Sequence, residues 1–235
     1  MILNLFFERR FFIVKLTKII FAAVLVVCTM MVASVGQCAK DQTPKYSANK
    51  AILAYAEVYA FGSPSDSRYI GLTKNDIAEI KRQINAKIAG DFEEFCLSED
   101  SVNKLTDVYI KKIKSAMKIK TTIKEKSTEA PVVNLTANIL NNESYENQAN
   151  NDKNLQALVF SILGLKEQGK TDADLMADST FQKTSVDCIT NFINGLNINQ
   201  KKTVYIKCKK ITGEDGNIYW APEEPEVIMN FVQGK

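Results

Sequence analysis

Two short patterns in the sequence carry residues that could act as a nucleophile and its base. Ser47-Ala-Asn-Lys50 and Ser101-Val-Asn-Lys104 both have the Ser-x-x-Lys spacing, which on a helix can bring a lysine amine to a serine hydroxyl. Both serines also stand where a helix is expected to begin, and serine is a preferred N-cap residue. The companion Ser-Asp-Asn and Lys-Thr-Gly motifs are absent, so helix capping is the favoured interpretation.

The chain contains no histidine. This excludes Ser-His-Asp and Cys-His catalysis, histidine bases and histidine metal sites. Glu223, Glu224 and Glu226 could supply acid–base groups, but carboxylates at a helix start are also explained by the helix dipole. Asp172 and Asp174 lack the glycine and terminal glutamate of a calcium loop. We therefore predict no catalytic residue, no metal site and no cofactor.

The N-terminal segment has the order of a secretory signal. Four basic residues between positions 9 and 18 precede an uncharged apolar run over 19–36, which ends in small residues. A run of about 18 residues is near the lower limit for crossing a bilayer, so an uncleaved anchor is the alternative. We predict a signal peptide or lipoprotein signal over 1–38 and a single domain over 39–235.

Cys38 is a candidate for lipid modification. Val35-Gly36-Gln37-Cys38 resembles a bacterial lipobox, in which a small residue precedes the modified cysteine. Val35 and Gly36 fit this pattern, whereas Gln37 stands where Gly, Ala or Ser is usual. Ordinary signal cleavage close to this point is an equally weighted alternative.

The charge balance gives no reason to expect nucleic acid as a partner. The first 39 residues hold four of the 30 basic side chains and one of the 27 acidic ones, so 26 of each remain. The excess positive charge belongs to the leader segment alone, and the rest of the chain is neutral.

The cysteines show no C-x-x-C spacing, so neither a zinc site nor a thioredoxin-type motif is supported. Outside the cytoplasm a disulfide is permitted. Cys188 and Cys208 are expected on the apolar faces of a helix and of a strand, and we predict a disulfide between them. Cys96 is then a buried thiol, although it could equally pair with either.

Hydrophobic periodicity predicts the elements that position these residues. An alanine-rich helix ends at Gly62, further helices start at Thr73 and Ser98, and a hairpin covers 119–140. Residues 141–154 are polar and asparagine-rich and are expected to form a loop. Two helical stretches follow over 155–164 and from Thr171 to about 196, then a second hairpin over 203–220 and a closing helix after Pro222.

The order of these elements predicts an α+β fold, in which an antiparallel sheet from two β-hairpins packs against amphipathic helices. The expected inner face of the sheet carries Val133, Leu135, Val204, Ile206 and Cys208. We expect this face to contact helices that carry Ile80, Ile84, Leu105, Leu175, Ile189 and Phe192.

A resemblance to a known family rests on the export signal and on three stretches, Val132–Leu140, Lys202–Ile211 and Tyr219-Trp220-Ala221-Pro222. In these features the chain resembles an exported lipoprotein family of low-GC bacteria. The family is of unknown function, and the resemblance spans about Ser47 to Gly234. It implies a cystatin-like or nuclear-transport-factor-2-like fold and brings no functional residues with it.

Tyr205, Tyr219 and Trp220 are candidates for the lining of a ligand cleft, because aromatic residues at strand ends can form one. Alternating lysines on the predicted strands could form a basic sheet face toward anionic membrane or wall polymer, although a solvated face is favoured. These lysines are Lys118, Lys120, Lys124, Lys126, Lys207, Lys209 and Lys210.

The sequence therefore predicts an extracytoplasmic, non-enzymatic module, secreted or tethered at the cell envelope, that binds a small ligand or an envelope protein. A cell-envelope hydrolase that uses carboxylates such as Glu223 or Glu224 and a purely structural envelope protein are the alternatives. Two carboxylates across a groove would favour the hydrolase, and an apolar, aromatic-rimmed cleft would favour ligand binding.

Overall fold

The computed structural model describes residues 43–140 and 142–234, which form two compact units. Within these residues, unit 1 comprises 85–112 and 142–197, and unit 2 comprises 43–84, 113–140 and 198–234. The sequence pattern predicts one domain over 39–235 and gives no sign of this division. The boundary falls inside two helices, α3 (Lys74–Gly90) and α4 (Glu99–Met117), where helical periodicity continues and no linker pattern marks it.

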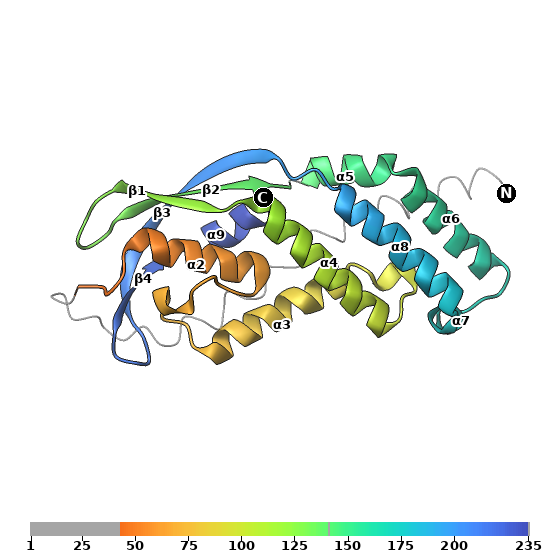
Figure 1. Ribbon diagram of the computed structural model, residues 1–235, viewed down its shortest axis with the longest axis horizontal. Coiled ribbons are helices and arrows are strands. Elements are labelled where there is room, and N and C mark those ends of the chain that lie inside the picture. Colours follow the sequence, from red (N-terminus) through yellow and green to blue (C-terminus); the bar gives the residue numbers. More distant parts are fainter. Residues whose placement is uncertain (1–42, 141, 235) are drawn as a thin grey trace. The chain divides into compact units, whose positions relative to one another are not determined.

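Unit 2 contains a four-stranded antiparallel sheet in the order β1-β2-β3-β4 (Figure 1). The predicted α+β fold with two hairpins in one sheet is confirmed. The strands are β1 (Lys120–Glu125), β2 (Val132–Ile139), β3 (Gln200–Thr212) and β4 (Ile218–Pro222). Two helices, α2 (Ala48–Phe61) and α9 (Pro225–Val232), and a short 3₁₀ turn (Ser67–Tyr69) complete the unit with parts of α3 and α4.

Alternation along β2 separates the two faces of the sheet. Val133, Leu135, Ala137 and Ile139 are buried, and the residues between them are partly exposed. Val133 pairs with Ile206 of β3, so the inward positions of neighbouring strands coincide. The predicted inner face of the first hairpin is therefore correct.

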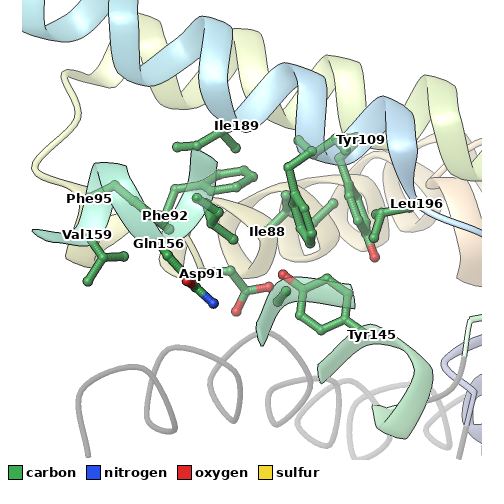
Figure 2. Close-up of a pocket in the computed structure, with 14 residues that line it drawn as sticks. Ile88, Asp91, Phe92, Phe95, Tyr109, Tyr145, Gln156, Val159, Ile189 and Leu196 are labelled. Atoms are coloured by element: carbon green, nitrogen blue, oxygen red, sulfur yellow. The ribbon is translucent and has the colours of Figure 1, made fainter. Parts of the chain in front are cut away.

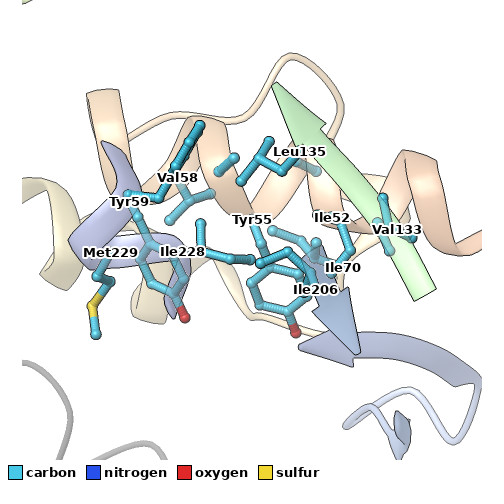
Figure 3. Packing of buried hydrophobic residues seen from close by; sticks show 14 of the residues in the cluster. Ile52, Tyr55, Val58, Tyr59, Ile70, Val133, Leu135, Ile206, Ile228 and Met229 are labelled. Atoms are coloured by element: carbon cyan, nitrogen blue, oxygen red, sulfur yellow. The ribbon is translucent and has the colours of Figure 1, made fainter. Parts of the chain in front are cut away.

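Helix α2 packs against β1, β2, β4 and α9. Its alanines Ala51, Ala54 and Ala56 are buried, and such small side chains allow close approach of neighbouring elements. Figure 3 shows Ile52 and Val58 of α2 in the same cluster as Leu135 of β2 and Ile228 of α9. The predicted stop at Gly62 is confirmed: Gly62 has a φ of 65°, and a Cβ there would lie 2.8 Å from the Lys81 Cα.

The predicted helix partners of the sheet are wrong in part. Ile80 of α3 lies in the core that the sheet forms with α2 and α9, and Ile84 packs against that core. The remaining four predicted partners are buried residues of unit 1, namely Leu105, Leu175, Ile189 and Phe192. Periodicity identifies which face of a helix is buried, but it carries no information about what covers that face.

Unit 1 is built from helices throughout its described residues. It contains the end of α3, a 3₁₀ turn (Glu93–Phe95), most of α4, α5 (Asn142–Asn151), α6 (Lys153–Glu167), α7 (Asp172–Ala177) and α8 (Ser179–Gly195). The expected loop over 141–154 is replaced by α5. Its asparagines are poor helix formers, but Tyr145 and Ala149, four residues apart, are both buried, and tertiary packing outweighs propensity.

Two N-terminal caps determine where the two helices after α6 begin. Thr171, the predicted helix start, forms a capping box with Asp174: the Thr171 hydroxyl accepts from the Asp174 N–H at 3.1 Å, and the Asp174 carboxylate accepts from the Thr171 N–H at 2.8 Å. The single helix expected after Thr171 is interrupted at Asp178. Its carboxylate accepts from the N–H groups of Thr180 and Phe181 and so begins α8 as a separate helix.

Gln182 of α8 joins three segments of unit 1. Its side chain is buried, and its amide nitrogen donates to the carbonyl oxygens of Cys96 and Leu175, each at 2.9 Å. Its amide oxygen accepts from the Ser98 N–H at 2.8 Å. Cys96 has a φ of 53°, so this side chain also holds a residue in the left-handed region, which is uncommon outside glycine.

Candidate functional site

An apolar cavity of about 40 Å³ lies within unit 1. Its lining comes from α3, α4, α5, α6 and α8 and from the segments next to them. Most of these side chains are aliphatic or aromatic. Tyr109 and Tyr145 add phenol hydroxyls, Gln156 adds an amide, and Asp91 adds a carboxyl group. The apolar lining residues are Ile88, Phe92, Phe95, Ala149, Leu155, Val159, Ile189, Phe192, Ile193 and Leu196.

The aromatic side chains are set by packing between helices. Tyr145 of α5 and Phe192 of α8 meet edge to face, with ring centroids 5.8 Å apart and an interplanar angle of 78°. Phe92 is buried just before the 3₁₀ turn that follows α3, and Phe95 is buried at the end of that turn. Rigid rings on separate helices thus define the walls.

Asp91 is the one acidic residue among the described residues that line the cavity. Figure 2 shows its carboxyl group pointing toward Tyr145 and Gln156. Desolvation raises the pKa of Asp91 to about 7, and the positive charge of Lys87 only partly opposes this rise. Near neutral pH the group is therefore divided between its protonated and ionised forms.

The two tyrosines of the cavity are neutral in the physiological range. Burial raises the pKa of Tyr109 and of Tyr145, and the negative charge of Asp91 raises both further. The Gln156 amide donates to the Asn150 carbonyl oxygen. Asp91 is consequently the group of the cavity that changes charge between pH 4 and pH 8.

Asp91→Asn is expected to increase stability at pH 8 by roughly 4 kcal/mol and to have little effect at pH 4. Because the folded-state pKa of Asp91 lies above its ordinary value, the native state binds this proton more tightly than the unfolded chain. The free energy of unfolding of the wild-type protein therefore falls as pH rises from about 4 to about 7. The Asp91→Asn variant lacks the titrating carboxyl group, so its free energy of unfolding does not fall for this reason.

Urea unfolding of wild type and Asp91→Asn at both pH values measures this difference. The control is Asp107→Asn, an exposed position on α4. An equal effect of Asp91→Asn at pH 4 and pH 8 would contradict the raised pKa.

The predicted cleft residues have three different surroundings. Tyr205 is 59% exposed, and Lys124 Nζ lies 3.9 Å from the centroid of its ring. The Tyr219 hydroxyl donates to the Asp215 carboxylate at 2.7 Å. Trp220 is buried and lines a hollow of about 290 Å³ in unit 2. Ala48, Ile123, Lys126, Ser127, Thr128 and Pro131 complete that hollow, so the three aromatic residues do not share it.

The two Ser-x-x-Lys patterns lie at or near helix starts, but capping explains them only in part: the Ser47 side chain makes no capping hydrogen bond, and Ser101 lies inside α4. Ser47 is the N-cap residue of α2, and Lys50 Nζ lies 5.1 Å from the centroid of the Tyr69 ring. At the start of α4 the cap is Ser98, whose hydroxyl accepts from the Ser101 N–H at 3.3 Å. Neither serine lines the cavity of unit 1.

The glutamates considered for a hydrolase are exposed around the start of α9. Glu224 is the N-cap residue of this helix, and Pro225 follows at its first position. Glu223 and Glu226 are exposed beside it. None of the three lines the cavity of unit 1 or the hollow of unit 2.

Six of the seven lysines considered for a basic face, all but Lys210, are exposed. Lys120, Lys124, Lys207 and Lys209 are exposed on the strands. The Lys210 side chain is only 10% exposed and forms an ion pair with Glu129 at 2.9 Å. The solvated face that was favoured for these lysines therefore describes all of the set except Lys210.

The predicted Cys188–Cys208 disulfide is not formed in the structure. Cys96, Cys188 and Cys208 are free thiols, with Cys188 in unit 1 and Cys208 in unit 2. Both predicted partners lie on apolar faces, but in separate units. Burial raises the pKa of the Cys208 thiol to about 12, and the Cys96 thiol donates to the Asp172 carboxylate at 3.3 Å. Cys38 and the signal over 1–38 lie outside the described residues.

No protein-family model, curated protein sequence or solved structure matches this chain. Across 43–140 and 142–234, no helix is both long and apolar enough to span a membrane. The same residues hold no cluster of three or more cysteine, histidine or acidic side chains that could bind a metal.

Sequence reasoning missed Asp91 and the cavity around it. The sequence feature that could have indicated the site was the position of Asp91 among the regularly spaced apolar residues Ile88, Phe92 and Phe95. Tyr109 lies on the helix predicted to start at Ser98, but nothing in its spacing connected it with Tyr145. The connection depends on α5, a segment whose sequence predicts a loop.

Proposed function

We propose that this protein is an exported, non-enzymatic binding module whose unit 1 takes an apolar ligand in the cavity beside Asp91. The observation that supports this proposal is the lining itself, which is aromatic and aliphatic with a single carboxyl group. A carboxylate-dependent hydrolase of the usual type needs a second acid about 5–10 Å away, and the described lining residues include none.

The export part of the proposal rests on the order of residues in 1–38. Mass spectrometry of the protein isolated from its own host is expected to give a mature chain that starts between residues 34 and 39. A diacylglycerol adduct on Cys38 would make it a lipid-tethered envelope protein, and an unmodified start would make it a secreted one. A mature protein that retains Met1 would contradict cleavage.

The ligand part is tested with 1-octanol, an uncharged probe with one alkyl chain. We expect 1-octanol to bind unit 1 in NMR titrations and to raise the melting temperature. Ala149→Leu places a larger side chain in the cavity and is expected to weaken binding about tenfold, because roughly two buried methylenes of the ligand are displaced.

The matched control is Ala157→Leu, an exposed position on α6, which should leave the affinity for 1-octanol unchanged. Absence of 1-octanol binding to the wild-type protein, or equal binding by Ala149→Leu, would contradict an apolar ligand in this cavity.

A further inference from the structure

Resting on the proposed function, we infer that the ligand of unit 1 carries one ammonium group on an alkyl chain, with the Asp91 carboxylate as its counter-ion. The cavity combines one acidic side chain with several aromatic rings, and both attract a cation. An ammonium group beside Asp91 would therefore have a charged partner and aromatic neighbours at the same point of the cavity.

The electrostatic character of the lining supports this choice of ligand. None of the described residues that line the cavity is lysine or arginine. Lys87, near the end of α3, influences Asp91 through its charge but is not part of the lining. A ligand carboxylate or phosphate would thus meet a like charge, whereas an ammonium would meet the opposite one.

The burial of Asp91 supplies the energetic reason. An ionised carboxylate in an apolar site is costly unless it is paired. A bound cation removes part of this cost, so the ligand and the ionised form of Asp91 stabilise each other. The same cation gains attraction from nearby aromatic rings. Phe92 follows Asp91 in the chain, and the charge of Asp91 raises the pKa of both Tyr109 and Tyr145.

The size of the cavity limits the apolar part of the ligand. A volume of about 40 Å³ corresponds to roughly three water-sized spheres on the usual scale. A linear alkyl chain, with its methylenes in single file, suits such a space better than a fused ring system. The remainder of the chain would extend from the cavity.

The charge state of the site makes a pH dependence part of the inference. Tyr109 on α4 and Tyr145 on α5 stay neutral below pH 9, Gln156 on α6 does not titrate, and α8 contributes apolar side chains. Asp91 changes from mostly protonated at pH 6 to mostly ionised at pH 8. The affinity for an alkyl ammonium is therefore expected to rise about tenfold over this range.

The experiment compares n-octylamine, 1-octanol and octanoate by NMR titration of the full chain at pH 8, below their aggregation concentrations. We expect n-octylamine to bind at least tenfold more tightly than 1-octanol, and octanoate to bind most weakly. Asp91→Asn should remove the preference for n-octylamine over 1-octanol. Asp107→Asn, which removes the same charge at an exposed position, should keep the preference.

The outcomes separate the two proposals. Equal affinities of the wild-type protein for n-octylamine and 1-octanol would overturn the ammonium inference and leave the apolar-ligand proposal standing. Persistence of the preference in Asp91→Asn would also overturn the inference, because the counter-ion would then lie elsewhere. Failure of all three probes to bind would overturn both.

Discussion

Leu135→Asp is expected to leave unit 2 unfolded at 25 °C. Leu135 is fully buried on β2, where it pairs with Thr121 of β1 and Val204 of β3. It belongs to the core that the sheet forms with α2 and α9. An aspartate there loses the burial of a leucine side chain and leaves a carboxylate without a partner. Together these effects cost several kcal/mol, comparable with the whole stability of a typical domain.

Far-UV circular dichroism during thermal unfolding measures this effect. Lys201→Asp is the control, because it introduces the same side chain at an exposed position of β3. The control should melt close to wild type. A wild-type melting temperature in Leu135→Asp would show that the register of β2 is wrong.

Gln182→Met is expected to destabilise unit 1 by about 3 kcal/mol. Methionine has a similar volume but cannot replace the three hydrogen bonds of the buried glutamine. The Leu175 carbonyl oxygen keeps a bond from the Asp178 N–H at 3.3 Å. The Ser98 N–H and the Cys96 carbonyl oxygen lose the partner that Gln182 provides, and each unsatisfied buried group costs about 1–3 kcal/mol.

Urea unfolding, with amide hydrogen exchange of residues in α8 as the local probe, measures this change. Thr184→Met is the matched control on the same helix, because Thr184 is exposed. The control should stay within about 0.5 kcal/mol of wild type. A similarly small effect of Gln182→Met would contradict the role of the amide as a bridge.

The elements of unit 2 were predictable because their signals are local. Alternation at Val133 and Leu135 marks a strand with one buried face, and Gly62 marks a helix end that needs a positive φ. The predicted helix start at Thr73 is also correct: the Thr73 N–H donates to the Asp76 carboxylate at 2.8 Å. Each of these features depends on residues within a few positions of one another.

The site was not predictable because it depends on contacts between distant segments. Tyr145 and Phe192 meet across α5 and α8, and the asparagines around Tyr145 indicate a loop when they are taken alone. Apolar faces at Cys188 and Cys208 are correctly expected to be at least partly buried, but a face does not specify its partner. The raised pKa of Asp91 likewise depends on the desolvation that these packed helices produce.

The pairing of β2 with β3 affects how the chain folds during its synthesis. Ile139 pairs with Gln200 across the whole intervening segment of unit 1, and α2 contacts α9 near the other end of the described chain. Such long-range contacts slow folding, because loop closure precedes the gain from burial. During synthesis β2 has an unpaired edge and an uncovered apolar face until β3 emerges. A chain interrupted before residue 200 is therefore expected to aggregate rather than to persist as a folded fragment.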